Sequence, residues 1–383
     1  MTTAALIVGA GQSTRMGTER PKPYLKLGGQ TVMRRSVEAF LREGVIDLVQ
    51  CVIGSQHERL FEDATTGLTL RRPVPGGRNR QESVSLGLDR LAGEGVTKVL
   101  IHDAARPLVS SEVIRRVVDA LDRSAAVLPV MPVRDSLKRV VDGQLVGAVD
   151  RTEMAVAQTP QGFHFPLIHK LHQDHSGGEF TDDTALVQAA GLPVSIVAGD
   201  RRNLKITDPS DLDLARELLP SITVVGQGFD VHALEPGDGM ILGGLRLDEG
   251  LRMVGHSDAD VALHAITDAL LGTIGDGDIG ALFPPTDAAW KGADSALFLQ
   301  EACRRVTDRG GSVRHVDLTI IGERPKIGPI RDAMRERIGA IIALSPARIS
   351  VKATTTERLG FTGRGEGLAA QATATVTLPS DEL

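Results

Sequence analysis

Short apolar runs alternate with longer amphipathic stretches through the first part of the chain. The amphipathic stretches repeat their apolar positions at helical spacing, which predicts helices at 32–42, 81–92, 111–122 and 182–190. The apolar runs are short and bounded by polar residues, which predicts buried strands at 4–8, 48–53, 99–102, 126–130 and 194–197. Strands that alternate with helices predict an α/β domain with a doubly wound, mostly parallel sheet.

The pattern changes at Pro220. A short amphipathic helix is predicted at 210–219, and a new strand begins at residue 222. The later elements are fewer and longer, with helices predicted at 261–271, 295–308 and 330–344 and strands at 316–321, 349–352 and 371–378. This order favours an α+β domain. No Gly/Ser-rich linker separates the two parts, so we expect two closely joined domains, 1–219 and 222–383.

Composition excludes several classes of protein. The 383 residues are 42% hydrophobic and 24% charged, which is ordinary for a globular chain. The two cysteines, Cys51 and Cys303, are too few for a disulfide-stapled secreted fold, and they favour a reducing, cytoplasmic setting. No apolar run reaches the roughly 18 residues of a membrane helix, and the N-terminus lacks the features of a signal peptide. A net charge of −6 with one Trp and one Tyr argues against a nucleic-acid partner.

A glycine-rich loop with two cations follows the first predicted strand. Gly9, Gly11 and Gly17 would let backbone N–H groups approach an anion, and Arg15 and Lys22 lie in and after the loop. The loop fits neither the dinucleotide fingerprint nor the P-loop. Two fixed cations suit a triphosphate that must release pyrophosphate. A tight turn with two solvated basic residues explains the loop alone equally well.

Further polar groups follow later strands of the same domain. Asp103 lies at the carboxyl end of a predicted strand, where open α/β sheets bind ligands, and it could hold Mg²⁺ or a substrate hydroxyl. A second glycine turn with cations spans 76–80 and opens a helix. Other charged or hydroxyl groups lie at 132–136, 150–151 and 203–211. Each alone is typical of a solvated loop, but together they indicate a pocket for phosphates.

These motifs resemble the 2-C-methyl-D-erythritol 4-phosphate cytidylyltransferase family over nearly all of residues 1–219. The resemblance rests on the glycine loop ending Arg-Met-Gly, on Pro-Lys, on His-Asp-Ala-Ala-Arg-Pro at 102–107, on Gln-Thr-Pro-Gln at 158–161, on Thr-Asp at 181–182 and on Asn-Leu-Lys-Ile-Thr at 203–207. It implies a nucleotide-diphospho-sugar transferase fold. It also implies a Mg²⁺-dependent reaction that joins CTP to methylerythritol phosphate and releases pyrophosphate.

The same resemblance implies roles for individual residues. A catalytic set would comprise Arg15, Lys22, Arg151 and Lys205, of which Arg15 and Lys22 would stabilise charge on the α-phosphate. The nucleotide would contact Gly11, Gly76, Arg80 and Ser83. The polyol phosphate and its surroundings would involve Asp103, Arg106, Ser136, Thr159 and Thr181.

A candidate metal site lies in the second part of the chain. Asp230 and His232 are two apart in a predicted strand, so they project to the same side, and His264 lies on the helix that we take to start at Asp258. Two histidines and one carboxylate are the ligand set of a catalytic zinc, and Asp260 or Asp268 could orient the other ring nitrogen of His264. Most histidines are structural or solvated, so the alternative stays open. A denser histidine cluster at 164–175 is interpreted as a polar surface segment.

Two more segments point to diphosphate chemistry. A Gly/Pro-rich loop at 276–287 carries three acids, and consecutive threonines at 354–356 are followed by Arg364 among glycines. Hydroxyls and a guanidinium beside glycines suit a diphosphate. A threonine run is otherwise typical of an exposed strand end.

These strings resemble the 2-C-methyl-D-erythritol 2,4-cyclodiphosphate synthase family over residues 222–378. The resemblance rests on Phe-Asp-Val-His at 229–232, His-Ser-Asp-Ala-Asp-Val-Ala-Leu-His at 256–264 and the threonine segment at 352–367. It implies trimers with active sites between subunits. The 2-phosphate of cytidine-diphospho-methylerythritol would attack the β-phosphate and expel CMP. Pro285 departs from the family, which usually has Asp there.

This second resemblance also implies residue roles. Asp230, His232 and His264 would bind Zn²⁺, with Mn²⁺ or Mg²⁺ as alternatives, and His256 and Thr355 would stabilise the transition state. The remaining substrate contacts would be Ser257, Asp278, Ile279, Gly280, Phe283, Thr286, Asp287, Pro325, Lys326, Thr354, Thr356, Glu357, Phe361 and Arg364, with Asp230, His232 and His256 again.

Together the two resemblances imply a bifunctional enzyme of the non-mevalonate isoprenoid pathway. The kinase of the intervening step is absent, so contact with it as a partner is a hypothesis only. We expect a homotrimer through the second domain, with hexamers open because relatives of the first domain often dimerise. The alternatives are a nucleotidyltransferase for another polyol phosphate, a second domain that is a metal-binding assembly module, and a fusion in which one site has decayed.

Overall fold

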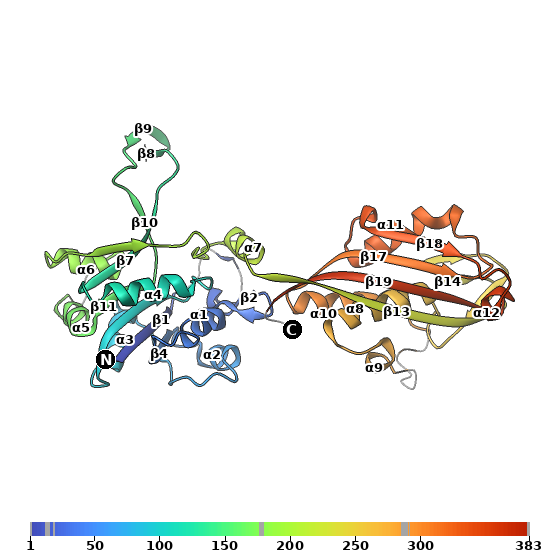
Figure 1. The fold of residues 1–383 in the computed structure, drawn as a ribbon, viewed down its shortest axis with the longest axis horizontal. Helices are drawn as coiled ribbons and strands as arrows, with labels where there is room; N and C mark the ends of the chain where they lie inside the picture. The colour runs from blue at the N-terminus through green and yellow to red at the C-terminus, as the bar shows by residue number, and fades with distance from the viewer. Residues whose placement is uncertain are drawn as a thin grey trace. The chain divides into compact units, whose positions relative to one another are not determined.

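The computed structural model describes residues 2–11, 16–17, 20–175, 180–284, 290 and 292–380 (Figure 1). The predicted site residues Arg15, Thr286 and Asp287 lie outside these ranges, as does Pro285. The chain divides into two compact units, Met1–Leu219 and Pro220–Leu383, called unit 1 and unit 2 below. Among the described residues, no helix has the length and apolar character needed to span a bilayer.

Unit 1 is built on one eight-stranded sheet with the order β10-β7-β11-β6-β1-β4-β5, and β12 also pairs with β7. Its strands are β1 (Thr2–Gly9), β4 (Leu48–Ile53), β5 (Val74–Pro75), β6 (Val96–Asp103), β7 (Ala126–Pro132), β10 (Ala155–Ala157), β11 (Gln161–His164) and β12 (Ser195–Ala198). The adjacent strands β6, β1, β4 and β5 are parallel, which confirms the predicted fold class. Strand β11 runs antiparallel between β6 and β7 and was not predicted.

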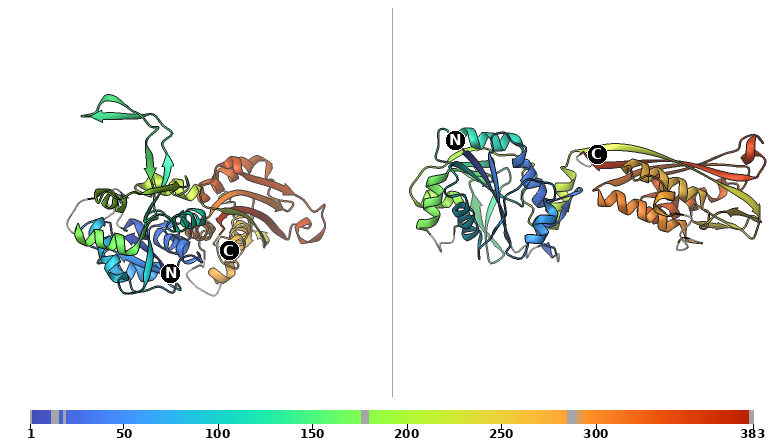
Figure 2. Two further views of the ribbon diagram at one scale, coloured as in Figure 1. Left: turned by 60° about the vertical axis from the view of Figure 1, so that its left-hand side comes forward. Right: turned by 90° about the horizontal axis from the view of Figure 1, so that it is seen from below.

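Helices cover both faces of this sheet (Figure 2). They are α1 (Val32–Leu41), α2 (Glu58–Ala64), α3 (Arg80–Leu91), α4 (Ser111–Ala120), α5 (Phe165–Asp174), α6 (Asp183–Ala189) and α7 (Pro209–Glu217). Phe40 of α1 and Val117 of α4 belong to one apolar core, whereas Leu88 of α3 and Ile168 of α5 belong to another. Smaller elements are the 3-10 turn η2 (Lys22–Tyr24), β2 (Lys26–Leu27) and β3 (Gln30–Thr31).

The histidine-rich segment at 164–175 is mainly helix α5, so its interpretation as a polar surface segment is wrong. Phe165, Ile168 and Leu171 bury one face of the helix, and His172 is buried with them. The apolar spacing of these residues is helical, but the interspersed histidines hid it.

A two-stranded hairpin, β8 (Leu137–Val141) and β9 (Gln144–Val149), projects from the body of unit 1 (Figure 1). Its apolar side chains are largely in solvent, with Leu145 67% exposed and Val140 59% exposed. An exposed apolar hairpin of this kind is typical of an interaction surface.

Unit 2 is a five-stranded sheet with the order β16-β13-β19-β17-β18, and its main helices lie on one face (Figures 1 and 2). The strands are β13 (Ser221–Pro236), β16 (Leu251–Val254), β17 (Ser312–Ile321), β18 (Ile349–Thr354) and β19 (Gly367–Pro379). The helices are α8 (Val261–Ile274), α10 (Ser295–Asp308) and α11 (Arg331–Ile342). Short elements are the hairpin of β14 (Met240–Leu242) and β15 (Leu245–Leu247), the helices α9 (Ile279–Leu282) and α12 (Gly360–Gly363), and the 3-10 turns η4 (Gly328–Ile330) and η5 (Pro346–Arg348).

Helix α8 packs directly on the backbone of β13. A Cβ atom added to Gly226 would lie 2.1 Å from the Ala269 carbonyl oxygen, and one added to Gly228 would lie 2.0 Å from that of Ala265. Real Cβ atoms do not approach oxygen so closely, so these two positions exclude every larger residue in this packing. The opposite side of β13 is open, with Val225 and Phe229 each more than half exposed.

Candidate active sites

The first candidate site surrounds Asp103, which ends β6 at the carboxyl edge of the sheet of unit 1. Its carboxylate lies 2.7 Å from Lys205 Nζ and 3.2 Å from Arg80 Nε. Burial opposes the ionisation of Asp103, but the charges of Arg80 and Lys205 outweigh it and hold its pKa well below the usual range. The site therefore gathers cations from α3 and from the segment before α7 around one ionised carboxylate.

A hydrogen-bonded chain beneath Asp103 fixes the edge of this site. The Thr159 hydroxyl accepts from the Asp103 backbone N–H at 3.1 Å and lies 2.9 Å from His102 Nδ1. His102 Nε2 is 3.0 Å from the Arg106 carbonyl oxygen, which can only accept, so we assign the ring proton to Nε2. Burial lowers the pKa of His102 to about 4. The His102 ring is therefore neutral, and its role is structural rather than that of a cation.

Arg106 holds the segment that carries Lys205. Its guanidinium donates to the carbonyl oxygen of Asn203 at 2.8 Å and to that of Ala157 at 3.3 Å. Asn203 is fully buried and donates to the Thr159 carbonyl at 2.7 Å. Arg106 and Asn203 together set the position of the chain two residues before Lys205.

The second glycine turn packs against the end of β1 and the start of α3. A Cβ atom on Gly76 would lie 2.3 Å from the Ala10 side chain and 2.9 Å from Ser83 Oγ, so only glycine fits. Ser83 Oγ accepts from the Gly77 N–H at 3.1 Å and donates to the Asn79 carbonyl at 2.8 Å. No atom lies within 4 Å of a Cβ built on Gly11, so the space above the first glycine loop is open among the described residues.

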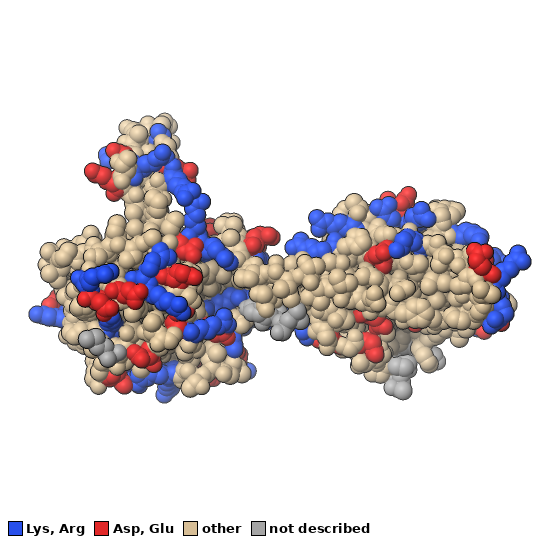
Figure 3. Space-filling view, viewed as in Figure 1, with Lys and Arg blue, Asp and Glu red and all other residues tan. Residues whose placement is uncertain are grey.

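Not all predicted residues of the first site meet at Asp103. Ser136 and Arg151 flank the projecting hairpin and are exposed, and Thr181 is exposed just before the N-cap of α6. Within the described ranges, no hydrogen bond or ion pair joins these three to Asp103 or Lys205. Lys22 lies in η2 and is half-buried. Basic and acidic side chains are interspersed over the visible face of unit 1, so no broad basic surface covers it there (Figure 3).

The second candidate site is a cluster of Asp230, His232 and His264 whose donor atoms could hold one metal ion. Asp230 Oδ2 lies 3.0 Å from His232 Nε2 and 2.9 Å from His264 Nδ1, and the two ring nitrogens are 3.2 Å apart. A tetrahedral Zn²⁺ with bonds of about 2.0–2.1 Å separates its donors by roughly 3.4 Å, so the three atoms fit one ion. Contacts with the His232 and His264 rings outweigh burial and hold the pKa of Asp230 well below its usual range.

Neighbouring groups orient the two histidines of this cluster. His232 Nδ1 donates to the Val254 carbonyl at 2.9 Å, which leaves Nε2 for a metal. His264 Nε2 contacts Ser295 Oγ at 2.8 Å and Ser257 Oγ at 3.2 Å.

The prediction that Asp260 or Asp268 orients His264 is wrong. Helix α8 begins at Val261, and Asp260 is its N-cap, accepting from the backbone N–H groups of Ala262 and Leu263. Asp268 accepts from the Ile279 N–H at 2.7 Å. Both carboxylates are therefore engaged by backbone donors instead of by the His264 ring.

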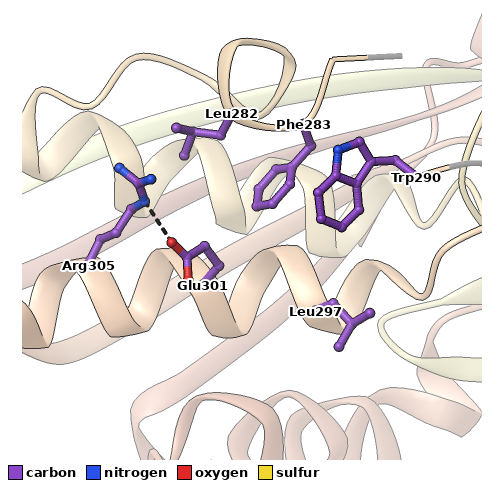
Figure 4. Close-up of a pocket in the computed structure, with 6 residues that line it drawn as sticks. All are labelled: Leu282, Phe283, Trp290, Leu297, Glu301 and Arg305. Atoms are coloured by element: carbon purple, nitrogen blue, oxygen red, sulfur yellow. Dashed lines mark hydrogen bonds and ion pairs between the residues drawn. The ribbon is translucent and has the colours of Figure 1, made fainter. Parts of the chain in front are cut away.

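The predicted substrate loop lies beside this cluster. Asp278 caps α9 by accepting from the Ala281 N–H, while Ile279 is tied to Asp268, and Gly280 follows within α9. His256 is exposed, and Ser257 follows it beside His264. A cavity of about 460 Å³ is lined by Leu282, Phe283, Trp290, Leu297, Glu301 and Arg305 (Figure 4).

Aromatic rings connect this cavity with the metal cluster. Phe283 meets Phe298 with ring centroids 4.5 Å apart, and Phe298 lies 6.1 Å from His264. Figure 4 shows Phe283 and Trp290 side by side above α10.

The remaining predicted residues of the second site lie at the end of β18 and in the segments that follow β17 and β18 and that precede β19, and of these Phe361 packs at Gly367 beside the His232 backbone. Thr354 pairs with Ile321, Ile321 with Ala369, and Ala369 with Val231. Three strand spacings therefore separate Thr354 from the level of the metal cluster, about 14 Å. Thr355, Thr356 and Glu357 lie next to Thr354. Arg364 forms an ion pair with Glu366. Pro325 is buried and Lys326 is exposed.

Several polar residues that support the two sites were not predicted from the sequence. Ser295 orients His264 and is itself held by Asp258. Asp183 contacts Arg80 and is itself contacted by His172. No spacing rule marks them, because their partners come from distant segments. The only local signal was the Asp182–Asp183 pair at the start of the helix predicted at 182–190.

Comparison with known proteins defines the class of each unit. The family model of 2-C-methyl-D-erythritol 4-phosphate cytidylyltransferase matches residues 3–221, and that of the YgbB family matches residues 223–377. The chain is 49% identical to the bifunctional enzyme IspD/IspF of Paramagnetospirillum magneticum, over 98% of this chain and 99% of that protein. The corresponding protein of Rhodospirillum rubrum is 48% identical, over 98% and 99%. The structure of the bifunctional IspDF from Campylobacter jejuni aligns with a TM-score of 0.51 and 30% identity, covering 99% of each chain.

The fold and sites thus define a cytidylyltransferase unit followed by a cyclodiphosphate synthase unit. The chain belongs to the family of bifunctional IspD/IspF enzymes of the methylerythritol phosphate pathway. It carries both a cytidylyltransferase and a 2,4-cyclodiphosphate synthase.

Proposed function

We propose that the cations around Asp103 carry out cytidylyl transfer by positioning and by charge. The phosphate of methylerythritol phosphate is already anionic, so its attack on the α-phosphate of CTP needs alignment and neutralisation more than a general base. Arg15, Lys22, Arg151 and Lys205 would stabilise charge as pyrophosphate leaves. The observation that supports this is the convergence of Arg80 and Lys205 on the carboxyl edge of the sheet.

The ligand contacts of the first site follow from the family resemblance. Gly11, Gly76, Arg80 and Ser83 would hold the nucleotide, and the polyol phosphate would contact Asp103, Ser136, Thr159 and Thr181. Mg²⁺ would neutralise the phosphates of CTP and enter with them, because the charge of Asp103 is already matched by Lys205 and Arg80.

In the second site, Asp230, His232 and His264 would hold the divalent ion, for which we propose Zn²⁺. Two imidazoles and one carboxylate suit zinc, with Mn²⁺ and Mg²⁺ as weaker fits. The ion would polarise and align the diphosphate. The 2-phosphate oxygen would attack the β-phosphorus and break its bond to CMP, while His256 and Thr355 stabilise the charge that develops. The cytidine diphosphate and erythritol groups would contact the loop at 278–283 and the residues near Lys326, Thr354 and Arg364.

We further propose that a complete cyclase site is shared between subunits. Thr354 and the metal cluster are about 14 Å apart within one chain, which supports completion of each site by a neighbour in a homotrimer. The exposed hairpin of unit 1 supports a second contact, which would join trimers into hexamers. Contact with the kinase of the intervening step and a cytoplasmic location stay predictions.

Two assays test these assignments on the full chain. With Mg²⁺, CTP and methylerythritol phosphate, pyrophosphate release should require both substrates. With cytidine-diphospho-methylerythritol 2-phosphate, CMP release should require the divalent ion and stop with a chelator. Pyrophosphate release that is faster with another polyol phosphate would overturn the proposed acceptor.

A further inference from the structure

A buried carboxylate outside the roles described above lies against Arg80. The Asp183 side chain is 2% exposed, and its Oδ2 lies 2.8 Å from Arg80 Nη1. On its other side, Oδ1 lies 3.1 Å from Nε2 of His172, whose side chain is fully buried. The backbone N–H of Asp183 donates to Gln161 Oε1 at 3.1 Å. Asp183 is therefore fixed from β11, from α5 and from α3.

Arg80 is held between two carboxylates from different elements. Nε lies 3.2 Å from Asp103 at the end of β6, and Nη1 contacts Asp183 at the start of α6. The hydrogen bond at Nε and the ion pair at Nη1 engage two nitrogens of a rigid planar guanidinium, which restrains its orientation as well as its position. The side chain remains 28% exposed, so part of the cation faces the edge of the sheet where the nucleotide phosphates are proposed to bind.

Because it is buried, the ion pair between Arg80 and Asp183 is not explained by folding stability alone. Burying a carboxylate costs several kcal/mol of desolvation, and an apolar pair of similar volume often serves stability as well. Arg80 outweighs that burial and holds the pKa of Asp183 below its usual value. Such a pair is better explained by the orientation of a functional cation. Without Asp183, Arg80 would keep only Asp103, which it already shares with Lys205.

An uncharged contact joins the same elements independently. Gln81, the next residue of α3, donates to the His175 carbonyl at 2.9 Å and accepts from the Phe180 N–H at 3.3 Å. The start of α3 is thus anchored to the residues around α5 and α6 without Asp183. The charge of Asp183 is therefore not needed to bring these segments together, and its carboxylate contacts only His172 and the Arg80 guanidinium among the described ion pairs.

We propose that Asp183, oriented by His172, is a positioning residue for cytidylyl transfer. It holds the Arg80 guanidinium in the orientation that meets the triphosphate of CTP. The inference rests on the proposed nucleotide-binding role of Arg80.

The test compares steady-state constants for Asp183→Asn in the full-length enzyme. Loss of one charge-assisted contact should raise KM for CTP roughly tenfold, with KM for methylerythritol phosphate within about twofold of the parent value. His172→Gln keeps an N–H donor and should resemble the parent, whereas His172→Leu should raise KM for CTP. CMP release by unit 2 should be unchanged in all three variants, which reports that unit 2 is intact. An unchanged KM for methylerythritol phosphate reports that unit 1 is folded.

Two further variants separate this inference from the role of Arg80. Arg80→Ala should raise KM for CTP, and adding Asp183→Asn to it should cause no further rise, because the two residues act as one unit. If Arg80→Ala leaves KM for CTP unchanged, the proposed nucleotide role fails. If Arg80→Ala raises it but Asp183→Asn does not, the positioning role is overturned. Gln81→Leu is the structural control, and an equal change in KM for CTP there would also overturn it.

Discussion

Ser295 Oγ lies 2.8 Å from Nε2 of His264, and the Ser295 hydroxyl donates to the carboxylate of Asp258. The serine oxygen is thereby left to accept the ring N–H of His264, which turns Nδ1 towards Asp230. Ser295 is fully buried at the start of α10, and its backbone N–H also donates to Asp258. Ser295 and Asp258 are not candidate metal ligands themselves, but together they set the orientation of the His264 ring.

Ser295→Ala should therefore weaken binding of Zn²⁺ at the cluster by roughly tenfold or more, because the ring loses the partner that fixes its tautomer. Competition with a chromophoric chelator would measure the dissociation constant directly. Ser221→Ala, at the exposed start of β13, should leave it unchanged. Equal affinities in the parent and Ser295→Ala proteins would contradict this orientation of His264.

His232→Ala should abolish cyclisation and leave cytidylyl transfer within about twofold, because the metal cluster and Asp103 belong to different units. CMP and pyrophosphate release, measured on the same preparation, provide the comparison. A matched loss of both activities would show that the two sites are not independent.

Unit 1 should lose stability as the pH falls from about 6.5 to about 4. Burial lowers the pKa of His102 to about 4, so below 6.5 the unfolded chain binds a proton that the folded chain rejects. The loss should approach about 3 kcal/mol for this group. Tyr24, the only tyrosine and fully buried in unit 1, reports this unfolding through near-ultraviolet circular dichroism.

A neutral replacement of the histidine provides the control. His102→Gln should flatten the pH dependence of unit 1 over this range. Fluorescence of Trp290, the only tryptophan, follows unit 2 in the same samples. The same slope in the parent and His102→Gln proteins would assign the pH dependence to other groups.

Charge on the projecting hairpin should reduce the mass of the oligomer. Leu145 and Val146 are 67% and 55% exposed, so Leu145→Asp with Val146→Asp should remove an apolar contact between copies of unit 1. Sedimentation velocity should show a smaller species, with CMP release retained. Gln144→Asp adds one charge at the same tip and should change the mass little. An unchanged mass in the double variant would exclude the hairpin as an interface.

Sequence patterns predicted the α/β and α+β classes because long apolar periodicities survive in any tertiary context. Strand β4 was predicted with its observed bounds, and α10 likewise. Short elements escaped: β11 has four residues and its direction is set only by the neighbours β6 and β7. Helix α5 escaped because His172 looks polar in sequence, and its burial depends on Asp183, eleven residues later.

The metal cluster was predicted because strand periodicity places Asp230 and His232 on one side, and because the ligand types and the family resemblance pointed to His264 as the third member. The group that orients His264 could not be predicted, since Ser295 lies 31 residues further along the chain. The substrate contacts around Thr355 and Lys326 stay predictions that follow from family resemblance.

The contact between α8 and β13 has a consequence for variation at the metal site. Asp230 and His232 belong to β13 and His264 to α8, so the missing side chains of Gly226 and Gly228 set how far apart the ligands stand. A library of variants selected for loss of metal binding would therefore return substitutions at two positions that bear no donor atom. The coordination chemistry of this protein is specified as much by excluded volume as by its nitrogen and oxygen ligands.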